Sequence, residues 1–268
     1  MSEVSEAIER TAERDYIAGL GKGLAVIECF DETHGRLTIA QVAEMTRLSR
    51  AAARRCLLTL QRLGYAEFDG KFFSLTPRVL RLGYAYLASS ELPQLIQPFL
   101  EKVSEATDES CSASILDGNE ILYIARSARK RIMTVDLGVG TRLPAYCTSM
   151  GRVLLAALDP AEAMTRLQAS ERRALTAYTR TRVEEIMSTL SAAREQGFCV
   201  IDQELEVGLV SIAVPLIDST GRTVAAMNVG AQAGRVSAAE LPGRFLARLN
   251  EAKAHLRPLI KRAHARLR

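Results

Sequence analysis

Apolar side chains recur every three or four residues in three short stretches near the beginning of the chain. This spacing predicts three helices, over residues 20–30, 39–46 and 50–63. Thr38 and Ser49 stand where the second and third helices need an N-cap, and Gly64 stands just past the third. Because only a three-residue turn separates the second helix from the third, the pair is typical of a helix-turn-helix.

A β-hairpin is predicted directly after these helices. Residues 65–68 and 71–75 are interpreted as two strands, because Asp69-Gly70 between them favours a tight turn with positive φ angles. Thr76-Pro77 then starts a further helix that runs to about Ala88, and Ser89-Ser90 marks a domain boundary. The complete order, with the hairpin after three helices, is that of a winged helix-turn-helix.

The pattern changes in the rest of the chain. Strands are predicted over residues 111–117, 121–126, 131–136, 142–146, 198–202, 209–216 and 223–230. Helices are predicted over 92–106 and 149–157, from Asp159-Pro160, from a capping box at Thr181-x-x-Glu184 to Gln196, and from a second capping box at Ser237-x-x-Glu240. The last helix would turn Phe245, Leu249, Leu256, Ile260 and Leu267 inward and kink at Pro258. Strands, helices and strands again predict an antiparallel-rich α+β domain.

The third predicted helix has an uneven distribution of charge. Residues 47–63 contain five arginines and no acidic residue. At helical spacing Arg47, Arg50 and Arg54 share one face, and a second, apolar face consists of Ala53, Cys56, Leu57, Leu60 and Leu63. A helix with small residues near its start and arginines on its outer side suits the major groove of DNA.

Net charge also varies along the whole chain. It is −5 for residues 1–46, +6 for 47–81, −4 for 82–243 and +7 for 244–268, with a total of +4. A short basic segment in an otherwise nearly neutral chain is typical of a protein that binds phosphates through one region. The basic C-terminal stretch has two open interpretations, a contact with distant DNA phosphates or a cover over the second domain.

Composition excludes several classes of protein. No run of about 18 apolar residues predicts a transmembrane helix, and the acidic, polar N-terminus is unlike a secretory signal. Five scattered cysteines without a C-x-x-C pair, and three histidines without metal-ligand spacing, predict neither a disulfide framework nor a metal site. We therefore expect a protein of the reducing cytoplasm that needs no cofactor and contacts no membrane.

A search for catalytic motifs favours a binding protein over an enzyme. The chain contains no G-x-S-x-G, no H-E-x-x-H, no P-loop and no G-x-G-x-x-G that opens a helix. Cys147 precedes a helix start, where the pKa of a thiol can fall, but no histidine lies near it in sequence. We therefore expect no catalytic residue.

The stretch from Tyr146 to Arg152 favours an anion site instead. Small and polar residues lead into the helix that begins at Ser149, so free backbone N–H groups and the helix dipole gather at one place. A small carboxylate is a natural ligand there, and Arg152 could add charge. The alternative interpretation is an ordinary capped helix that packs on a sheet.

Taken together, these segments resemble the IclR family of bacterial transcription regulators over nearly the whole chain from about Asp15. The similar segments are Leu20–Leu24, Ile39–Ala43, Leu48–Arg55 in the recognition helix, Leu63–Tyr65 before the wing, Arg142–Arg152 and Gly197–Pro215. Tyr146–Arg152 and Asn228–Gly230 are similar to the subgroup of Pca and Pob regulators. By that resemblance the subgroup controls catabolism of protocatechuate and 4-hydroxybenzoate through the β-ketoadipate pathway, often as activators.

The resemblance implies an α+β architecture with two domains. A winged helix-turn-helix domain would span residues 15–76, a linker helix 77–90 and a GAF-like α+β effector-binding domain 91–268. It also implies a pocket that uses Ser149, Met150, Asp202, Ser211, Asn228 and Gly230. The helix start adds Thr148, Gly151 and Arg152, and we add Tyr146 because its ring could stack on an aromatic acid.

The expected function is regulation of aromatic-acid catabolism genes under control of a small carboxylate such as 4-hydroxybenzoate, protocatechuate or β-ketoadipate. Arg50 and Arg54 would reach base edges of double-stranded operator DNA, and Ser49 and Arg55 would contact phosphates. Further DNA contacts are expected from Lys22, Arg47, Ala51 and Lys71. A second copy of the chain, as a dimer or a dimer of dimers, is a further expected partner, as is RNA polymerase for an activator.

Three alternatives stay open at the level of the sequence. The chain could be a repressor that responds to another small organic acid. It could be an enzyme that works at residues 146–152, although an acid and base set is missing there. It could also be a ligand-binding protein whose N-terminal module no longer binds DNA.

Overall fold

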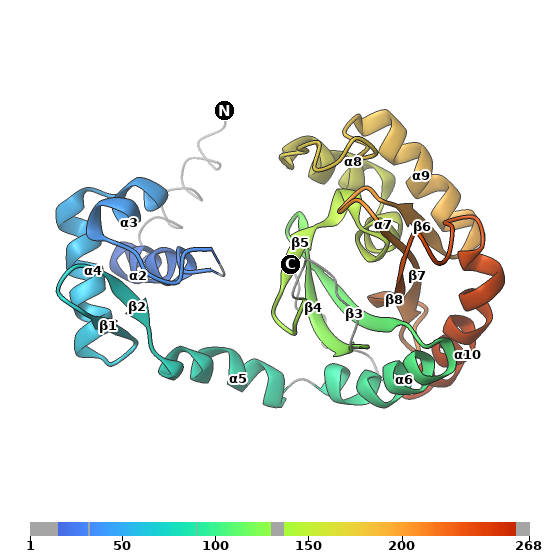
Figure 1. The fold of residues 1–268 in the computed structure, drawn as a ribbon, viewed down its shortest axis with the longest axis horizontal. Coiled ribbons are helices and arrows are strands. Elements are labelled where there is room, and N and C mark those ends of the chain that lie inside the picture. Colours follow the sequence, from blue (N-terminus) through green and yellow to red (C-terminus); the bar gives the residue numbers. More distant parts are fainter. Residues whose placement is uncertain (1–15, 32, 90, 130–136, 261–268) are drawn as a thin grey trace, which may run out of the picture. The chain divides into compact units, whose positions relative to one another are not determined.

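The computed structural model describes residues 16–260 apart from 32, 90 and 130–136. The chain divides into two compact units after Ser89. Each unit buries apolar residues of its own, so each has a separate hydrophobic core. Figure 1 shows the first unit in blue and teal and the second in green to red.

Three helices build the core of the first unit. They are α2 (Ala18–Glu28), α3 (Ile39–Thr46) and α4 (Arg50–Arg62). Thr38 caps α3 in a capping box with Gln41, and the Ser49 hydroxyl accepts a hydrogen bond from the backbone N–H of Ala52 at the start of α4. Both predicted caps are therefore confirmed.

The predicted hairpin is confirmed, whereas its predicted turn is wrong. Strands β1 (Ala66–Phe68) and β2 (Phe73–Leu75) pair antiparallel with Phe68 opposite Phe73. The loop between them is longer than a two-residue turn, and Gly70 has a positive φ (103°) while Asp69 does not. The carboxylate of Asp69 closes the loop by accepting hydrogen bonds from the backbone N–H groups of Lys71 and Phe72.

A helical segment follows the wing. It begins as a 3₁₀ turn, η1 (Pro77–Val79), and continues as helix α5 (Leu80–Ser89). The Thr76 hydroxyl accepts a hydrogen bond from the backbone N–H of Arg78, so Thr76 caps the segment as expected. Because proline lacks a backbone donor, Pro77 is tolerated at this first position.

A six-stranded antiparallel sheet lies at the centre of the second unit. Its strand order is β5-β4-β3-β8-β7-β6. The strands are β3 (Ser110–Asp117), β4 (Glu120–Ser127), β5 (Arg142–Pro144), β6 (Cys199–Asp202), β7 (Leu209–Ile217) and β8 (Thr223–Gln232). The predicted α+β class is confirmed, and the strand predicted over 131–136 lies outside the described residues.

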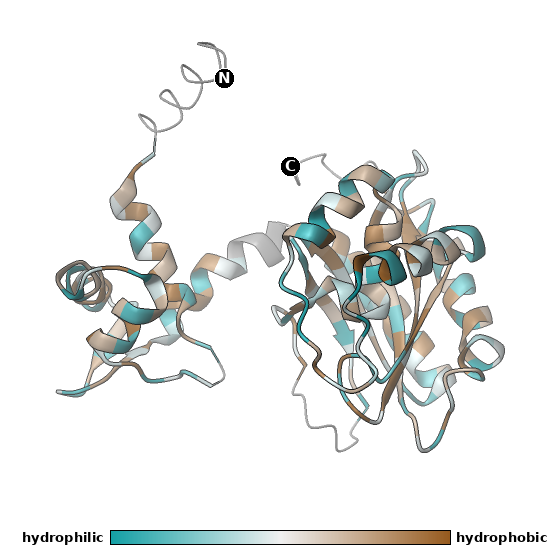
Figure 2. Cartoon of the chain, turned by 90° about the horizontal axis from the view of Figure 1, so that it is seen from above, coloured by the Kyte–Doolittle hydropathy of each residue, from teal (hydrophilic) through white to brown (hydrophobic). Residues whose placement is uncertain are grey.

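Helices cover both faces of this sheet (Figure 1). One face carries α6 (Glu91–Thr107) and α10 (Ala247–Leu256), and the other carries α7 (Ser149–Ala156), α8 (Pro160–Ala169) and α9 (Val183–Gln196). Successive residues of β7 serve the two faces in turn, since Ile212 and Val214 join the core under α6 and α10 while Ala213 joins the other. Figure 2 shows these apolar strands between helices whose outer sides are hydrophilic.

Both predicted capping boxes of the second unit need correction. Helix α9 begins at Val183 after Arg182, so Thr181 does not cap it; the Thr181 carbonyl accepts a hydrogen bond from Arg172 instead. Glu240 accepts hydrogen bonds from Ser237, but the next element is a π-helical turn, η3 (Pro242–Leu246). The α-helix after it ends at Leu256, so it stops before Pro258 and is not kinked there, and Leu267 lies outside the described residues.

Candidate functional sites

Helix α4 separates its charged side chains from its core contacts. Arg50, Arg54 and Arg55 are exposed, whereas Ala53, Leu57 and Leu60 are buried in the core of the first unit. The helix contains no acidic residue that could neutralise its arginines. Its outer side is therefore a row of cations, which is the chemistry that phosphates and guanine edges attract.

Two details of the predicted helix faces are wrong. Arg47 does not belong to α4: it ends α3 with a left-handed backbone (φ 56°), so its side chain does not share a helical face with Arg50 and Arg54. Leu63 is the C-cap of α4 and is 53% exposed rather than part of the apolar face. The prediction for Arg47 failed because it continued the helical spacing of α4 backwards through the turn before Ser49, where the backbone is not helical.

The other residues expected to contact DNA also lie at the surface of the first unit. Lys22 on α2, Arg47, Ser49, Ala51 and Lys71 are all exposed. The Nζ atom of Lys71 lies 5.0 Å from the ring centroid of Phe72 in the wing loop. The hydroxyl of Ser49 already serves as the cap of α4, so a phosphate contact would have to share it. The contacts themselves remain predictions.

The register of the large sheet builds a polar patch on the face that carries α7. One row across four strands consists of Arg126, Ser112, Asn228 and Ala213, and the next row consists of Ser110, Gly230, Ser211 and Ile201. Residues between these rows, such as Cys111 and Val229, join the core on the opposite face. Strand alternation thus gathers small polar side chains from three strands, and Arg126 from a fourth, beneath one helix.

A cavity lies between this patch and the start of α7. Its polar lining consists of Ser110, Ser112, Arg126, Thr148, Ser149, Ser211 and Asn228, and its apolar lining of Tyr123, Leu137, Met150, Ile201, Leu205 and Leu209, with Cys147 and Gly230. The empty space within and in front of these residues, with open solvent included, is about 540 Å³. Among the described residues that line it, Arg126 is the only one with a charge. The described part of the lining therefore combines one cation, several hydroxyls and an apolar wall.

Hydrogen bonds hold the polar groups in place. Arg126 donates from Nη1 to the Ser112 hydroxyl (3.0 Å), and the Asn228 side-chain oxygen accepts from the backbone N–H of Ser112 (3.1 Å). The Ser211 hydroxyl donates to the Ser149 hydroxyl (2.9 Å), which ties the sheet to the first residue of α7. These contacts place the Arg126 guanidinium beside hydroxyls that line the cavity.

Residues 84–256 match the family described as Bacterial transcriptional regulator IclR C-terminal, and residues 19–70 match the IclR helix-turn-helix domain. The chain is 49% identical over 237 residues to the Pca regulon regulatory protein of Pseudomonas putida, which covers 88% of this chain and 81% of that protein. The chain belongs to the IclR family of bacterial transcriptional regulators.

Two further similarities concern the Pob branch of the IclR family. The p-hydroxybenzoate hydroxylase transcriptional activator of Acinetobacter baylyi is 40% identical over 257 residues, covering 94% of this chain and 95% of that protein. The crystal structure of a double mutant of the PobR inducer-binding domain from Acinetobacter, in complex with 3-hydroxybenzoic acid, superposes with a TM-score of 0.60. It is 33% identical and covers 64% of this chain and 100% of that one. The predicted resemblance is confirmed.

Membership of a family of transcriptional regulators confirms the prediction that the chain is not an enzyme. Burial raises the pKa of the Cys147 thiol to about 12, so the thiolate that a nucleophile needs is scarce near pH 7.

Within the described residues we find neither a helix that could span a bilayer nor a cluster of ligands that could hold a metal ion.

Four residues predicted to bind the effector of this IclR-family protein do not line the cavity. Arg152 is 1% exposed, pairs with Glu204 and donates from Nε to the Tyr146 carbonyl, so its charge is already neutralised. Tyr146 is buried and its hydroxyl donates to the Arg173 carbonyl. Asp202 is exposed at the end of β6. Gly151, the fourth, faces the turn before α7. Thr148, Ser149, Met150, Ser211, Asn228 and Gly230 do line the cavity.

The polar lining residues that sequence reasoning missed are Ser110, Ser112 and Arg126, and they come from β3 and β4. Ser110, Ser112 and Ser114 alternate with Cys111 and Ala113, a period-two pattern that marks one polar face and could have been noticed. Arg126 carries no such signal. Its place opposite Ser112 follows from the pairing of β3 with β4, which the spacing of residues along the chain does not reveal.

Replacement of Gly151 by a larger residue is expected to destabilise the protein for a steric reason. A Cβ at this position would lie 2.2 Å from the carbonyl oxygen and 2.4 Å from the Cα of Ala145, both of them backbone atoms. Replacing a glycine inside a helix by alanine usually raises the free energy of unfolding by about 0.5–1 kcal/mol. Here Gly151→Ala should instead lower it by about 1–3 kcal/mol, because the added methyl group overpacks the site. Urea denaturation measures this change. Gly243→Ala, with open space around the added methyl, is the control and should leave the midpoint unchanged or higher.

Proposed function

We propose that this chain is a DNA-binding regulator of genes for aromatic-acid catabolism, controlled by a small aromatic or dicarboxylic acid bound in the cavity of the second unit. The observation that carries the proposal is the cavity itself, which Arg126 lines together with several hydroxyls and apolar side chains. A carboxylate would pair with the guanidinium, and an aromatic ring would lie against the apolar wall.

The expected ligands are 4-hydroxybenzoate, protocatechuate and β-ketoadipate. Support for this class comes from the relatives, whose names refer to the Pca regulon and to p-hydroxybenzoate hydroxylase, and from the 3-hydroxybenzoic acid complex of the PobR domain. The amide of Asn228 and the hydroxyls of Ser149 and Ser211 are available for the polar substituents of such acids. The backbone N–H groups at the start of α7 add a favourable dipole.

The first unit would read the operator through α4. Arg50 and Arg54 are the proposed base contacts, because both are exposed on the helix expected to enter the major groove. Four residues, Ser49, Arg55, Lys22 and Lys71, would position the unit on the phosphate backbone, and Arg47 and Ala51 are further proposed DNA contacts. The proposed domains are residues 15–76 for DNA, 77–90 for the linker helix and 91–268 for the effector.

Two exposed apolar surfaces support assembly of several copies. Ile17, Leu20 and Leu24 lie at helical spacing along α2 and its N-cap, and each is at least 48% exposed. Leu80 and Tyr84 on α5 are each 70% exposed. Exposed apolar side chains in such number usually mark a surface that a partner covers, so we propose a homodimer or a dimer of dimers. We also propose that it acts in the cytoplasm, where the operator DNA is. An activator of this kind would also contact RNA polymerase.

The effector can control DNA binding only by preferring one of two arrangements of the assembly. An activator is the favoured form because the Pob relative is named an activator. The alternative is a repressor whose operator affinity falls when another small organic acid binds.

Calorimetry and DNA mobility shifts with the full chain test the proposal. We expect at least one of 4-hydroxybenzoate, protocatechuate and β-ketoadipate to bind, and the chain to retard DNA from its own promoter region. Pyruvate and glyoxylate are the comparison acids. Binding of none of the three pathway acids would overturn the effector assignment, and failure to retard DNA with intact acid binding would overturn the regulator assignment.

A further inference from the structure

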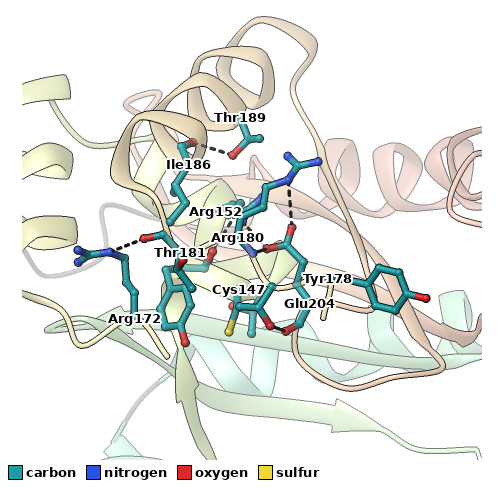
Figure 3. A network of polar contacts seen from close by, with 12 residues as sticks. Cys147, Arg152, Arg172, Tyr178, Arg180, Thr181, Ile186, Thr189 and Glu204 are labelled. Carbon is teal, nitrogen blue, oxygen red and sulfur yellow. Dashed lines mark hydrogen bonds and ion pairs between the residues drawn. The ribbon is translucent and has the colours of Figure 1, made fainter. Parts of the chain in front are cut away.

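A buried carboxylate lies directly behind the wall of the cavity. Glu204 belongs to the connection between β6 and β7 and is 4% exposed. Its Oε2 atom lies 2.6 Å from Nη2 of Arg152 on α7, which is 1% exposed (Figure 3). The same oxygen accepts a hydrogen bond from the backbone N–H of Arg180 (3.0 Å). One side chain thus joins α7 to the β6–β7 connection and to the segment before α9.

The segment before α9 is tied to the same connection by its hydroxyls. Thr179 donates to the Glu204 carbonyl (2.6 Å) and Thr176 donates to the Gln203 carbonyl (2.7 Å). The Arg180 guanidinium, which is half exposed, adds an ion pair of 3.9 Å with Oε1 of Glu204 (Figure 3). Residues 171–182 contain neither helix nor strand, so these contacts hold the segment where secondary structure does not.

The neighbours of Glu204 in the chain line the cavity. Ile201 and Leu205 lie on either side of it, and Leu209 opens β7. On the opposite side, Thr148, Ser149 and Met150 at the start of α7 also line the cavity. The Arg152–Glu204 pair therefore spans from the helix that forms one wall to the connection that forms the other.

We propose that Glu204 is a positioning residue of the effector site: it holds the Leu205–Leu209 wall at a set distance from α7 and so decides which acids the cavity admits. The inference rests on the proposed effector function. A dry ion pair with several hydrogen bonds has one well-defined geometry, because any displacement leaves a buried charge unpaired. Apolar contacts alone are less directional, so the wall would be wider and softer without the pair.

Glu204→Gln tests this positioning with a change of one charge and almost no change of shape. We expect the affinity for 4-hydroxybenzoate to fall at least tenfold. The discrimination between 4-hydroxybenzoate and the longer 4-hydroxyphenylacetate should shrink at least threefold, because a displaced wall admits the longer acid more easily. Hydrogen exchange of the acid-free protein should become faster over residues 203–209 before it changes elsewhere in the second unit.

Two further variants separate positioning from a loss of fold. Glu185→Gln removes an exposed carboxylate that lies 3.6 Å from Arg182, so it is the matched control and should change none of these readouts. Thr179→Val removes one hydrogen bond to Glu204 and keeps the buried pair, so it should shift selectivity in the same direction by a smaller factor even if Glu204→Gln does not fold.

The outcomes are distinguishable from those for the proposed function. If the natural chain binds 4-hydroxybenzoate and both variants keep its selectivity, the role of Glu204 is overturned while the effector function stands. If the natural chain binds none of the acids, the effector function fails, and exchange over 203–209 decides whether Glu204 still positions the wall. Unchanged exchange in both variants overturns the positioning role in either case.

Discussion

Arg54→Ala and Arg50→Ala should each weaken binding to a selected operator duplex about five- to 150-fold and relax the preference for one base pair. The physical reason is the loss of a bidentate contact with guanine, which is worth about 1–3 kcal/mol of discrimination. Both side chains are exposed on α4, and no acidic residue of that helix competes for them. Affinity measured on the operator and on each of its single-base variants gives the change at every position.

Arg62→Ala is the matched control for these two variants. It removes the same charge from the last turn of the same helix, away from the start that is expected to enter the groove. It should lower the affinity for every duplex by the same small factor, because a cation near the phosphates contributes to binding independently of the base sequence. If Arg50→Ala and Arg54→Ala weaken all duplexes equally, their proposed base-reading role is wrong and only phosphate contact is left.

Arg126→Gln should weaken binding of 4-hydroxybenzoate about ten- to 150-fold. A hydrogen bond to a charged group contributes about 1.5–3 kcal/mol, and Arg126 is the one charged side chain among the described residues of the cavity. Glutamine keeps a donor near Ser112, so the loss reflects the charge more than the packing. Calorimetry measures the affinity, and the DNA affinity of the acid-free variant should stay unchanged.

The control for Arg126 lies on β5, the edge strand of the same sheet that pairs with β4. Arg142 on β5 pairs with Asp117 and Glu120 and is exposed, so Arg142→Gln changes the same charge outside the cavity. Its acid affinity should equal that of the natural chain. Equal affinity of Arg126→Gln and the natural chain would show that the acid carboxylate lies elsewhere, with the start of α7 as the next candidate.

Much of the fold could be predicted because local chemistry dictates it. Ser49 caps α4 and Thr38 caps α3 through atoms within three residues of each other, and helical spacing identified Leu57 and Leu60 as core. Errors arose where distant contacts compete with local signals. Thr181 resembles a cap, but its carbonyl is held by Arg172, and the helix begins two residues later.

For the candidate effector site too, the sequence predicted what local residues determine and missed what distant residues determine. The sequence predicted the start of α7 as an anion site, and Thr148, Ser149 and Met150 do line the cavity. It also predicted Arg152 as the cation of that site, whereas tertiary packing pairs Arg152 with Glu204, 52 residues further along the chain. A buried arginine must find a counter-ion, and only the fold decides which carboxylate it meets.

The sequence by itself determined the family, the two-domain α+β organisation and the arginine face of α4, because these depend on residues close to one another in the chain. The tertiary structure alone decided that Arg126, Ser112 and Asn228 share one row of the sheet, and that Ser110, Gly230 and Ser211 share the next. Strand register brings together side chains from distant parts of the chain, such as Ser112 and Asn228, and no local periodicity encodes that pairing.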